Sequence, residues 1–152
     1  MISDICSFIR YGENKYPAAY FKSGMGSVTI YSNGKYIMQG LKTSEEPNLL
    51  FSTLKKELSP PLDASLFSPP IICNLVCLSS FNHSIDLNQL LLTLQGLNCD
   101  VIYEPESFPG LILKEDLCTY NIFSSGKFVI LGCKSIISAL NADSLLLTRN
   151  IL

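Results

Sequence analysis

His83 is the only histidine in the chain, and imidazole is the side chain that most often serves as a general acid or base near neutral pH. It lies between Asn82 and Ser84, ahead of a predicted helix, and Cys77 or Asp86 could pair with it as a catalytic dyad. No recognised catalytic motif surrounds these residues, so we favour an ordinary surface histidine and expect no enzyme.

The six cysteines could bind a metal or form disulfides, but they are scattered and include no Cys-x-x-Cys pair. With a single histidine available, a zinc site would need thiolates from distant positions. The Gly-Lys steps at 34–35 and 126–127 are followed by aromatic residues in predicted hairpins, which is not the pattern of a phosphate-binding loop. We therefore expect no metal and no cofactor, and reduced, buried thiols rather than disulfides.

The composition limits the classes of partner. The 152 residues are 47% apolar and 16% charged, which is typical of a folded domain. The formal net charge is −2, so the chain as a whole has no positive field to attract nucleic acid, and any such binding must use a local surface. The most apolar run, 71–78, is far shorter than the ~20 residues of a membrane span, and we expect no signal peptide at the start.

The chain matches itself at an offset of ninety-two residues. We therefore expect two copies of the strands and helices that would position functional residues. Tyr11 aligns with Tyr103, Lys22 with Lys114, and 30–35 (Ile-Tyr-Ser-Asn-Gly-Lys) with 122–127 (Ile-Phe-Ser-Ser-Gly-Lys). Each copy predicts extended runs and two strands joined at a glycine-containing turn. A helix follows in each copy, at 46–58 and at 135–147.

We predict three parts: an incomplete first repeat at 1–58, a Pro-rich linker at 59–70 and a complete second repeat at 71–152. In the second repeat, 71–78 is predicted to be a buried strand, and a helix over 86–95 is predicted to be capped by Ser84 or Asp86. Positions ninety-two residues earlier would precede residue 1. We therefore expect the first strand and helix of repeat one to be missing.

Three segments of the second repeat carry a family resemblance: 72–76 (Ile-Cys-Asn-Leu-Val), 103–112 (Tyr-Glu-Pro-Glu-Ser-Phe-Pro-Gly-Leu-Ile) and 122–127. Their order and spacing resemble the core of the TATA-box-binding protein family, and 11–58 resembles its first repeat more weakly. The resemblance implies an α+β saddle of two pseudo-symmetric repeats, with a curved antiparallel sheet and helices on its convex side. The duplication alone would predict only a repeated α+β unit.

The resemblance also implies a mode of DNA binding, in which apolar side chains wedge between base steps of the minor groove and kink the duplex; this family is itself the standard example. Phe108 and Phe123 match the wedging pair in the second repeat, and Tyr16 and Tyr31 take those places in the first. An unpaired hydroxyl in the stack would cost about 1–3 kcal/mol, so we expect the first half to kink DNA poorly or not at all. The alternative is that Phe108 and Phe123 are core residues.

Further positions match groove-facing residues of the family. Asn74 matches an asparagine that meets minor-groove acceptors, where an amide can read only the degenerate A·T pattern. Val76 and Val129 match apolar groove positions, whereas Leu131 and Gln39 stand where the family has threonine. We expect these two departures to weaken base recognition.

Lysines are the expected phosphate contacts, because such contacts supply most of the sequence-independent affinity for DNA. They occur as repeat-related pairs that would form a basic rim: Lys22 and Lys114, Lys35 and Lys127, Lys42 and Lys134. An ordinary solvated surface charge is the alternative for each of them.

Two acidic residues, Glu104 and Glu106, lie in the loop before Phe108, which in the family meets transcription factor IIB. Surface solvation is the alternative explanation for this pair. The matching loop of the first repeat, 11–15, would be the place for a factor of the IIA kind.

We therefore predict an initiation factor that bends A·T-rich promoter DNA mainly through its second repeat and recruits a IIB-like factor, in the nucleus or the compartment that holds the transcription machinery. The rival hypothesis is a protein-interaction module of transcription that has lost DNA binding. In both cases the incomplete sheet leaves an edge, which a second copy of the chain, a partner strand or a longer natural amino terminus would cover.

Overall fold

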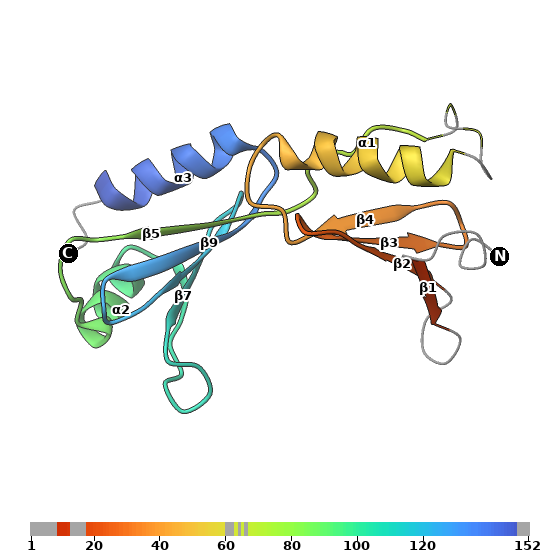
Figure 1. The fold of residues 1–152 in the computed structure, drawn as a ribbon. Helices are drawn as coiled ribbons and strands as arrows, with labels where there is room; N and C mark the ends of the chain where they lie inside the picture. Colours follow the sequence, from red (N-terminus) through yellow and green to blue (C-terminus); the bar gives the residue numbers. More distant parts are fainter. Residues whose placement is uncertain (1–8, 13–17, 60–62, 64, 66, 149–152) are drawn as a thin grey trace. The chain divides into compact units, whose positions relative to one another are not determined.

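The computed structural model describes residues 9–12, 18–59, 63, 65 and 67–148, with only the backbone described for 9–12. The chain divides into two compact units, Met1–Ile71 and Ile72–Leu152, called here the first unit and the second unit. Each unit contains one antiparallel sheet with helical cover on one of its faces (Figure 1).

The sheet of the first unit has four strands that follow one another in chain order: β1 (Ile9–Gly12), β2 (Ala18–Lys22), β3 (Ser27–Tyr31) and β4 (Tyr36–Gln39). Helix α1 (Glu46–Leu58) covers one face of this sheet (Figure 1). Leu50, Leu54 and Leu58 are fully buried against Phe21 and Val28 of the sheet. Their spacing of four residues puts the three leucines on one side of the helix, so that side faces the strands.

The sheet of the second unit has five strands in the order β5-β9-β8-β7-β6: β5 (Leu75–Ser80), β6 (Asp100–Ile102), β7 (Leu111–Lys114), β8 (Thr119–Ile122) and β9 (Lys127–Cys133). Helices α2 (Leu87–Gly96) and α3 (Ile136–Thr148) share one core with this sheet. The buried hydroxyl of Tyr120 donates to the carbonyl of Ala142 at 3.0 Å, which connects β8 to α3.

The predicted cap of α2 is confirmed at Asp86. Its carboxylate accepts hydrogen bonds from the N–H of Asn88 at 2.9 Å and of Gln89 at 3.1 Å. These two donors belong to the first turn and would otherwise lack partners within the helix, so the cap sets where α2 begins.

Strand register and backbone conformation confirm the duplication. Ser27 pairs with Gln39 in the first unit, and Thr119 pairs with Leu131 in the second, so the two hairpins have the same length. Both hairpins turn at a glycine of positive φ, Gly34 at 81° and Gly126 at 82°. Only glycine adopts this left-handed conformation without a steric cost, which explains why both copies have it at the same place.

Two elements of the second unit, β5 and α2, have no counterpart among the described residues of the first unit. As a result, β4 and β5 are each at an edge of their sheet. The α+β class predicted from the sequence is confirmed.

The prediction of a buried strand over 71–78 is wrong. The strand begins at Leu75, and its side chains alternate between half-buried and exposed, with Val76 54% and Leu78 82% exposed. Leu75 and Cys77 pack on the core, while the other face of the strand has no helix over it. In this chain the long apolar run therefore belongs to an edge strand with one uncovered face, and not to a strand that is covered on both faces.

Candidate nucleic-acid interface

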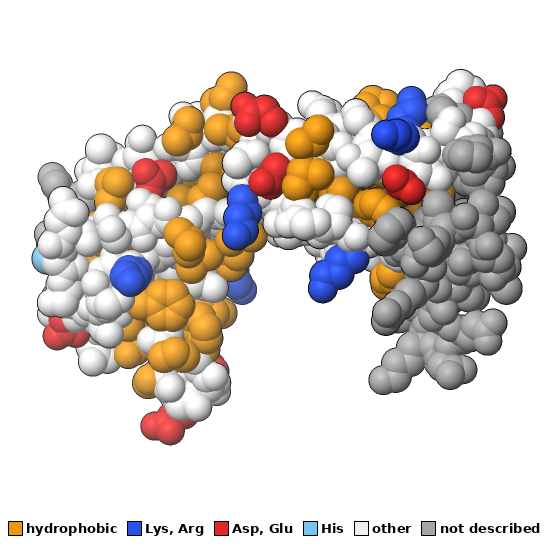
Figure 2. Space-filling model, viewed as in Figure 1, with side chains coloured by type: hydrophobic (Ala, Val, Ile, Leu, Met, Phe, Trp, Pro, Cys, Tyr) orange, Lys and Arg blue, Asp and Glu red, His pale blue; other side chains and the backbone are white. Residues whose placement is uncertain are grey.

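The face of each sheet that carries no helix is called here the open face. In the second unit, Leu113, Tyr120 and Ile130 point into the core, so their neighbours along each strand point to the open face. One row of cross-strand neighbours crosses all five strands: Leu78, Val129, Asn121, Ile112 and Ile102. Four of these five side chains are apolar, so the open face of this unit is largely hydrophobic. Figure 2 shows hydrophobic side chains and lysines next to one another on this unit.

Phe108 and Phe123 lie together on the second unit, beside the start of β7. Their ring centroids are 5.8 Å apart and the ring planes make an angle of 63°, an edge-to-face pair. Both rings are half-buried, and neither belongs to the hydrophobic core or packs against it. The structure thus brings the predicted wedging pair together at the surface.

Asn74 and Val76 lie at the start of β5, where β9 contains a bulge. Between the pairs Leu75–Cys133 and Cys77–Ile130, Val76 faces two residues of β9. One of these is Gly132, whose φ of 89° is typical of a bulge, and its N–H donates to Oδ1 of Asn74 at 3.0 Å. The bulge therefore holds the exposed Asn74 amide in place by its oxygen. Val129 and Leu131 follow along β9, both half-buried.

The six lysines of the predicted rim, Lys22, Lys35, Lys42, Lys114, Lys127 and Lys134, are all exposed. The units around them differ in charge: the first unit has seven basic and six acidic residues, and the second has four basic and seven acidic residues. The formal net charge is therefore +1 in the first unit and −3 in the second, which carries the aromatic pair.

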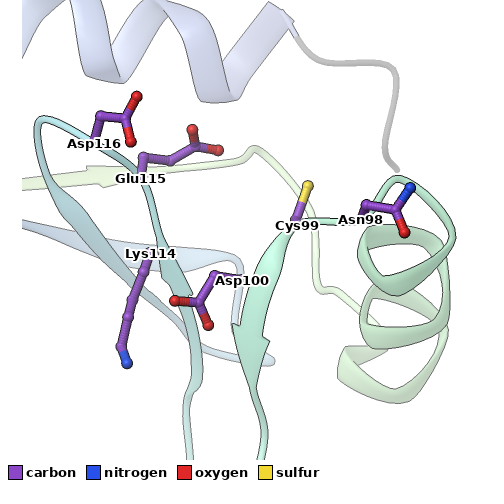
Figure 3. Close-up of a pocket in the computed structure, with 6 residues that line it drawn as sticks. All are labelled: Asn98, Cys99, Asp100, Lys114, Glu115 and Asp116. Atoms are coloured by element: carbon purple, nitrogen blue, oxygen red, sulfur yellow. The ribbon is translucent and has the colours of Figure 1, made fainter.

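An open pocket of about 410 Å³ lies between the segment that leads into β6 and the end of β7 with the turn after it. It is lined by Asn98, Cys99, Asp100, Lys114, Glu115 and Asp116 (Figure 3). Asp100 is the register partner of Lys114, and two further acidic residues follow Lys114 in the chain. The Lys114 side chain points away from Glu115 and Asp116 (Figure 3), but the three acidic residues make this part of the surface less favourable for an anionic ligand. Lys114 is therefore less suited to contact phosphate than Lys22, which is followed by the neutral turn 23–26.

The open face of the first unit carries different side chains. Its cross-strand row is Tyr20, Thr29 and Ile37, at the positions that Ile112, Asn121 and Val129 take in the second unit. Tyr31 is half-buried at the end of β3, and Gln39 is exposed at the end of β4. Tyr16 lies outside the described residues, so the structure leaves its side chain undescribed.

The loop before Phe108 is closed by its own backbone. The carbonyl of Glu104 accepts hydrogen bonds from the N–H of Ser107 and of Phe108, both at 2.9 Å. The side chains of Glu104 and Glu106 are both exposed. The loop thus presents two acidic side chains and, at its end, fixes the backbone that carries Phe108.

The surroundings of His83 and the state of Cys77 are those of ordinary side chains in the described part of the chain. His83 is exposed, and its ring centroid lies 6.3 Å from that of Phe81. Burial, together with the nearby Asp143, raises the pKa of the Cys77 thiol, which keeps it protonated near neutral pH and poorly nucleophilic.

The described part of the chain also contains no group of His, Cys, Asp and Glu side chains that could hold a metal ion. Its helices are all too short or too polar to cross a bilayer.

Sequence reasoning did not single out Leu78, Ile112 and Asn121 of the apolar row. The period-two alternation within β5, β7 and β8 carries this information, once the core-facing residues of each strand are known. It also gave no role to Gly110, which is buried beside the two rings.

The comparisons with known proteins agree on one family. The profile described as "Transcription factor TFIID (or TATA-binding protein, TBP)" matches residues 69–147. The TATA-box-binding protein of Methanothrix thermoacetophila is 33% identical over 131 residues, which are 82% of this chain and 70% of that protein. That of Pyrococcus horikoshii is 31% identical over 140 residues, 88% of this chain and 71% of the relative.

The solved structure of Methanococcus jannaschii TBP superposes with a TM-score of 0.80 at 28% sequence identity, and covers 96% of this chain and 84% of that one. This similarity, together with the antiparallel sheets and their helices, confirms the predicted TBP-like fold. The profile and the relatives confirm the resemblance found in the sequence. The chain therefore belongs to the TATA-box-binding protein family, a family of transcription factors.

Proposed function

We propose that this chain is a non-enzymatic transcription initiation factor that binds A·T-rich promoter DNA in the minor groove, bends it mainly through the second unit, and recruits a factor of the IIB type. The observation that carries the proposal is the Phe108–Phe123 pair, two partly exposed rings that are held edge to face outside the core. The site of action is then the compartment that holds the transcription machinery.

The physical requirement for such a wedge is a rigid apolar surface. Unstacking one base step costs a few kcal/mol. This cost is offset only when flat side chains and the adjoining apolar face replace the lost stacking contacts between the bases. Phe108 and Phe123 supply the rings, and the row from Leu78 to Ile102 supplies the apolar face beside them. Val76, Val129 and Leu131 extend this face along β5 and β9.

Asn74 would supply the polar contact at the floor of the groove. Its Oδ1 is occupied by the N–H of Gly132, so its NH₂ group is the part left to donate. The minor-groove edge of an A·T pair offers only acceptors, adenine N3 and thymine O2, which suit an amide donor. This pairing favours A·T over G·C without distinguishing A·T from T·A.

Lysines of both units would contact the phosphates on either side of the groove. Lys22, Lys35, Lys114 and Lys127 are the candidates, and Lys114 contributes least because Asp100 is its register partner and two acidic residues follow it in the chain. Each phosphate contact releases about 0.9 counterions, so four contacts would give a log–log salt slope near −3.6.

The test is a salt series with a fluorescently labelled A·T-rich duplex, with a G·C-rich duplex of equal length as control. We expect anisotropy to detect binding that weakens steeply with salt and that prefers the A·T-rich duplex. Absence of binding at low salt, or equal binding to both duplexes, would contradict the proposal.

The acidic loop is proposed as the contact for the IIB-like partner, since Glu104 and Glu106 are exposed and their backbone is closed into a turn. Glu106→Arg is expected to weaken capture of a IIB-like factor on the DNA complex roughly tenfold, with DNA affinity changed less. Glu45→Arg is the control, because Glu45 is exposed on the first unit and its side chain makes no capping hydrogen bond. Equal capture by both variants would remove the loop from the proposal.

The alternative function, a transcription interaction module without DNA binding, is favoured by one observation. The second unit, which carries the wedge candidates, has three more acidic than basic residues. The salt series distinguishes the two functions, because a module of this kind would leave both duplexes unbound. We retain the division into repeats at 1–58 and 71–152, joined by 59–70, as part of the proposal.

A further inference from the structure

Gly110 lies directly beneath the aromatic pair. It is buried just before β7, next to the register pair Leu111–Ile122, which puts it beside Phe123. A Cβ built on Gly110 would lie 2.7 Å from Cε1 of Phe108 and 3.0 Å from Cε1 of Phe123. The edges of both rings therefore occupy the space that any side chain at this position would need.

We propose that Gly110 is the positioning residue of the wedge: its missing side chain lets Phe108 and Phe123 stand edge to face on the open face. The part of this inference that concerns DNA rests on the proposed function, but the placement of the rings does not. The φ angle of Gly110 is not positive, so its backbone conformation does not require glycine. Glycine is needed here because the two rings occupy the space of a side chain.

The first unit contains the matching natural substitution. The position ninety-two residues before Gly110 is Ala18, which is 1% exposed and is the register partner of Tyr31. Tyr31 in turn matches Phe123. Ala18 therefore carries the methyl group that Gly110 lacks, on the strand position paired with the tyrosine that replaces Phe123. The first unit thus differs from the second both in the two rings and in the residue at the position of Gly110.

A methyl group at position 110 would move the rings before it moved the strand. The two closest atoms are the far ends of rotatable phenylalanine side chains, whereas the nearest backbone atom, the carbonyl oxygen of Ile122, is 3.2 Å away. The rings are only half-buried and can swing outward, and the backbone needs to give by no more than a few tenths of an ångström. Gly110→Ala is therefore expected to fold.

The first arm of the test examines the rings without DNA. Gly110→Ala is compared with the wild type and with Gly96→Ala, a control at which an added Cβ meets no described atom within 4 Å. The chain is labelled with 3-fluorophenylalanine, and the ¹⁹F resonances of Phe108 and Phe123 are assigned with single leucine variants. We expect both resonances to shift in Gly110→Ala and to stay in place in Gly96→Ala. Unchanged resonances would overturn the proposal.

The second arm measures DNA bending by fluorescence resonance energy transfer between the ends of an A·T-rich duplex. Gly110→Ala is expected to lose most of the bend while it keeps the salt slope of the wild type, because the lysines are untouched. A merely structural role would instead lower the melting temperature and weaken binding at every salt concentration. Shifted rings with a normal bend would refute the positioning role. If the wild type itself does not bend DNA, the proposed function fails, and ring placement is decided by the ¹⁹F arm alone.

Discussion

The two units repeat the same hairpin, but they divide the requirements of DNA binding unequally. The first unit has one more basic than acidic residue and a neutral turn after Lys22, but it has tyrosine where the second has phenylalanine. The second unit has the ring pair and an apolar open face, but it has three more acidic than basic residues. The positive net charge and the proposed wedge thus lie in different copies of one duplicated fold.

The units also differ in what covers the hairpin turn. A Cβ on Gly34 would meet no described atom within 4 Å, whereas one on Gly126 would lie 2.0 Å from the carbonyl oxygen of His83. The N–H of Phe81 donates to the carbonyl of Gly126 at 2.8 Å, and that of Ile85 to Ser124 at 2.9 Å. The loop between β5 and α2 therefore closes over the second hairpin, whose first strand leads directly to Phe123. The loop that joins the additional strand and helix is thus hydrogen-bonded to the hairpin that leads to the proposed wedge.

The largest expected effect concerns the two cores. Phe128 is fully buried in the second unit, and its counterpart Tyr36 is half-buried in the first, where its hydroxyl donates to the carbonyl of Ser68 at 2.6 Å. Phe128→Ala is expected to lower the free energy of unfolding by about 3–5 kcal/mol, and Tyr36→Ala by about 2 kcal/mol. Urea denaturation measures the loss, and hydrogen exchange shows in which unit it occurs. Equal losses of stability in the two variants would contradict the difference that we infer from the burial of Phe128 and Tyr36.

The next effect concerns the wedge. Phe108→Ala combined with Phe123→Ala is expected to abolish bending of an A·T-rich duplex and to weaken its binding roughly tenfold or more, about 1.4 kcal/mol for each factor of ten. Tyr31→Ala, the matched change in the first unit, should leave the bend in place. Circular dichroism and thermal melting serve as the fold control. A double variant that fails to fold would show that the rings support the core.

The smallest effect compares one helix position in the two units. Phe51 of α1 stacks on Tyr36 with ring centroids 6.0 Å apart, whereas Asp143 stands at this place in α3. Oδ1 of Asp143 is buried and lacks a hydrogen-bond partner within the described structure. Asp143→Ala is expected to raise the free energy of unfolding by about 1 kcal/mol, because an unsatisfied buried acceptor is removed.

Thiol labelling gives a second measure of that variant. Burial and Asp143 both raise the pKa of Cys77, so removal of the carboxylate lowers this pKa, and labelling should begin at a lower pH than in the wild type. Ser144→Ala, an exposed neighbour on α3, controls for the helix propensity of alanine. An unchanged labelling profile would show that Asp143 does not act on Cys77.

Much of the architecture was predictable because the chain contains two copies of one sequence pattern, and each copy can be compared with the other. The offset of ninety-two residues predicted both hairpins, and the helix expected over 46–58 is found with those bounds. The error over 71–78 has a physical origin. A continuous apolar run indicates that a segment is at least partly buried. Whether other elements cover both faces of the strand depends on the strand order, which is a property of the whole sheet.

The candidate site was predictable only in part, for a similar reason. The ring pair followed from a motif, and the acidic residues after Lys114 are adjacent to it in the sequence. That Asp100 stands opposite Lys114 depends on the pairing of β6 with β7, and the role of Gly110 depends on distances between side chains. Such contacts join residues far apart in the chain, and local patterns carry no information about them.

The equal spacing of the turn glycines has a consequence for protein engineering. Segments 27–39 and 119–131 have the same length, begin and end on paired residues, and reverse direction at a left-handed glycine in the same place. Chimeras that exchange the two segments therefore require no inserted or deleted residue. The side chains differ between the two copies, whereas the turn has the same geometry in both. The duplication can therefore still be recognised in the backbone.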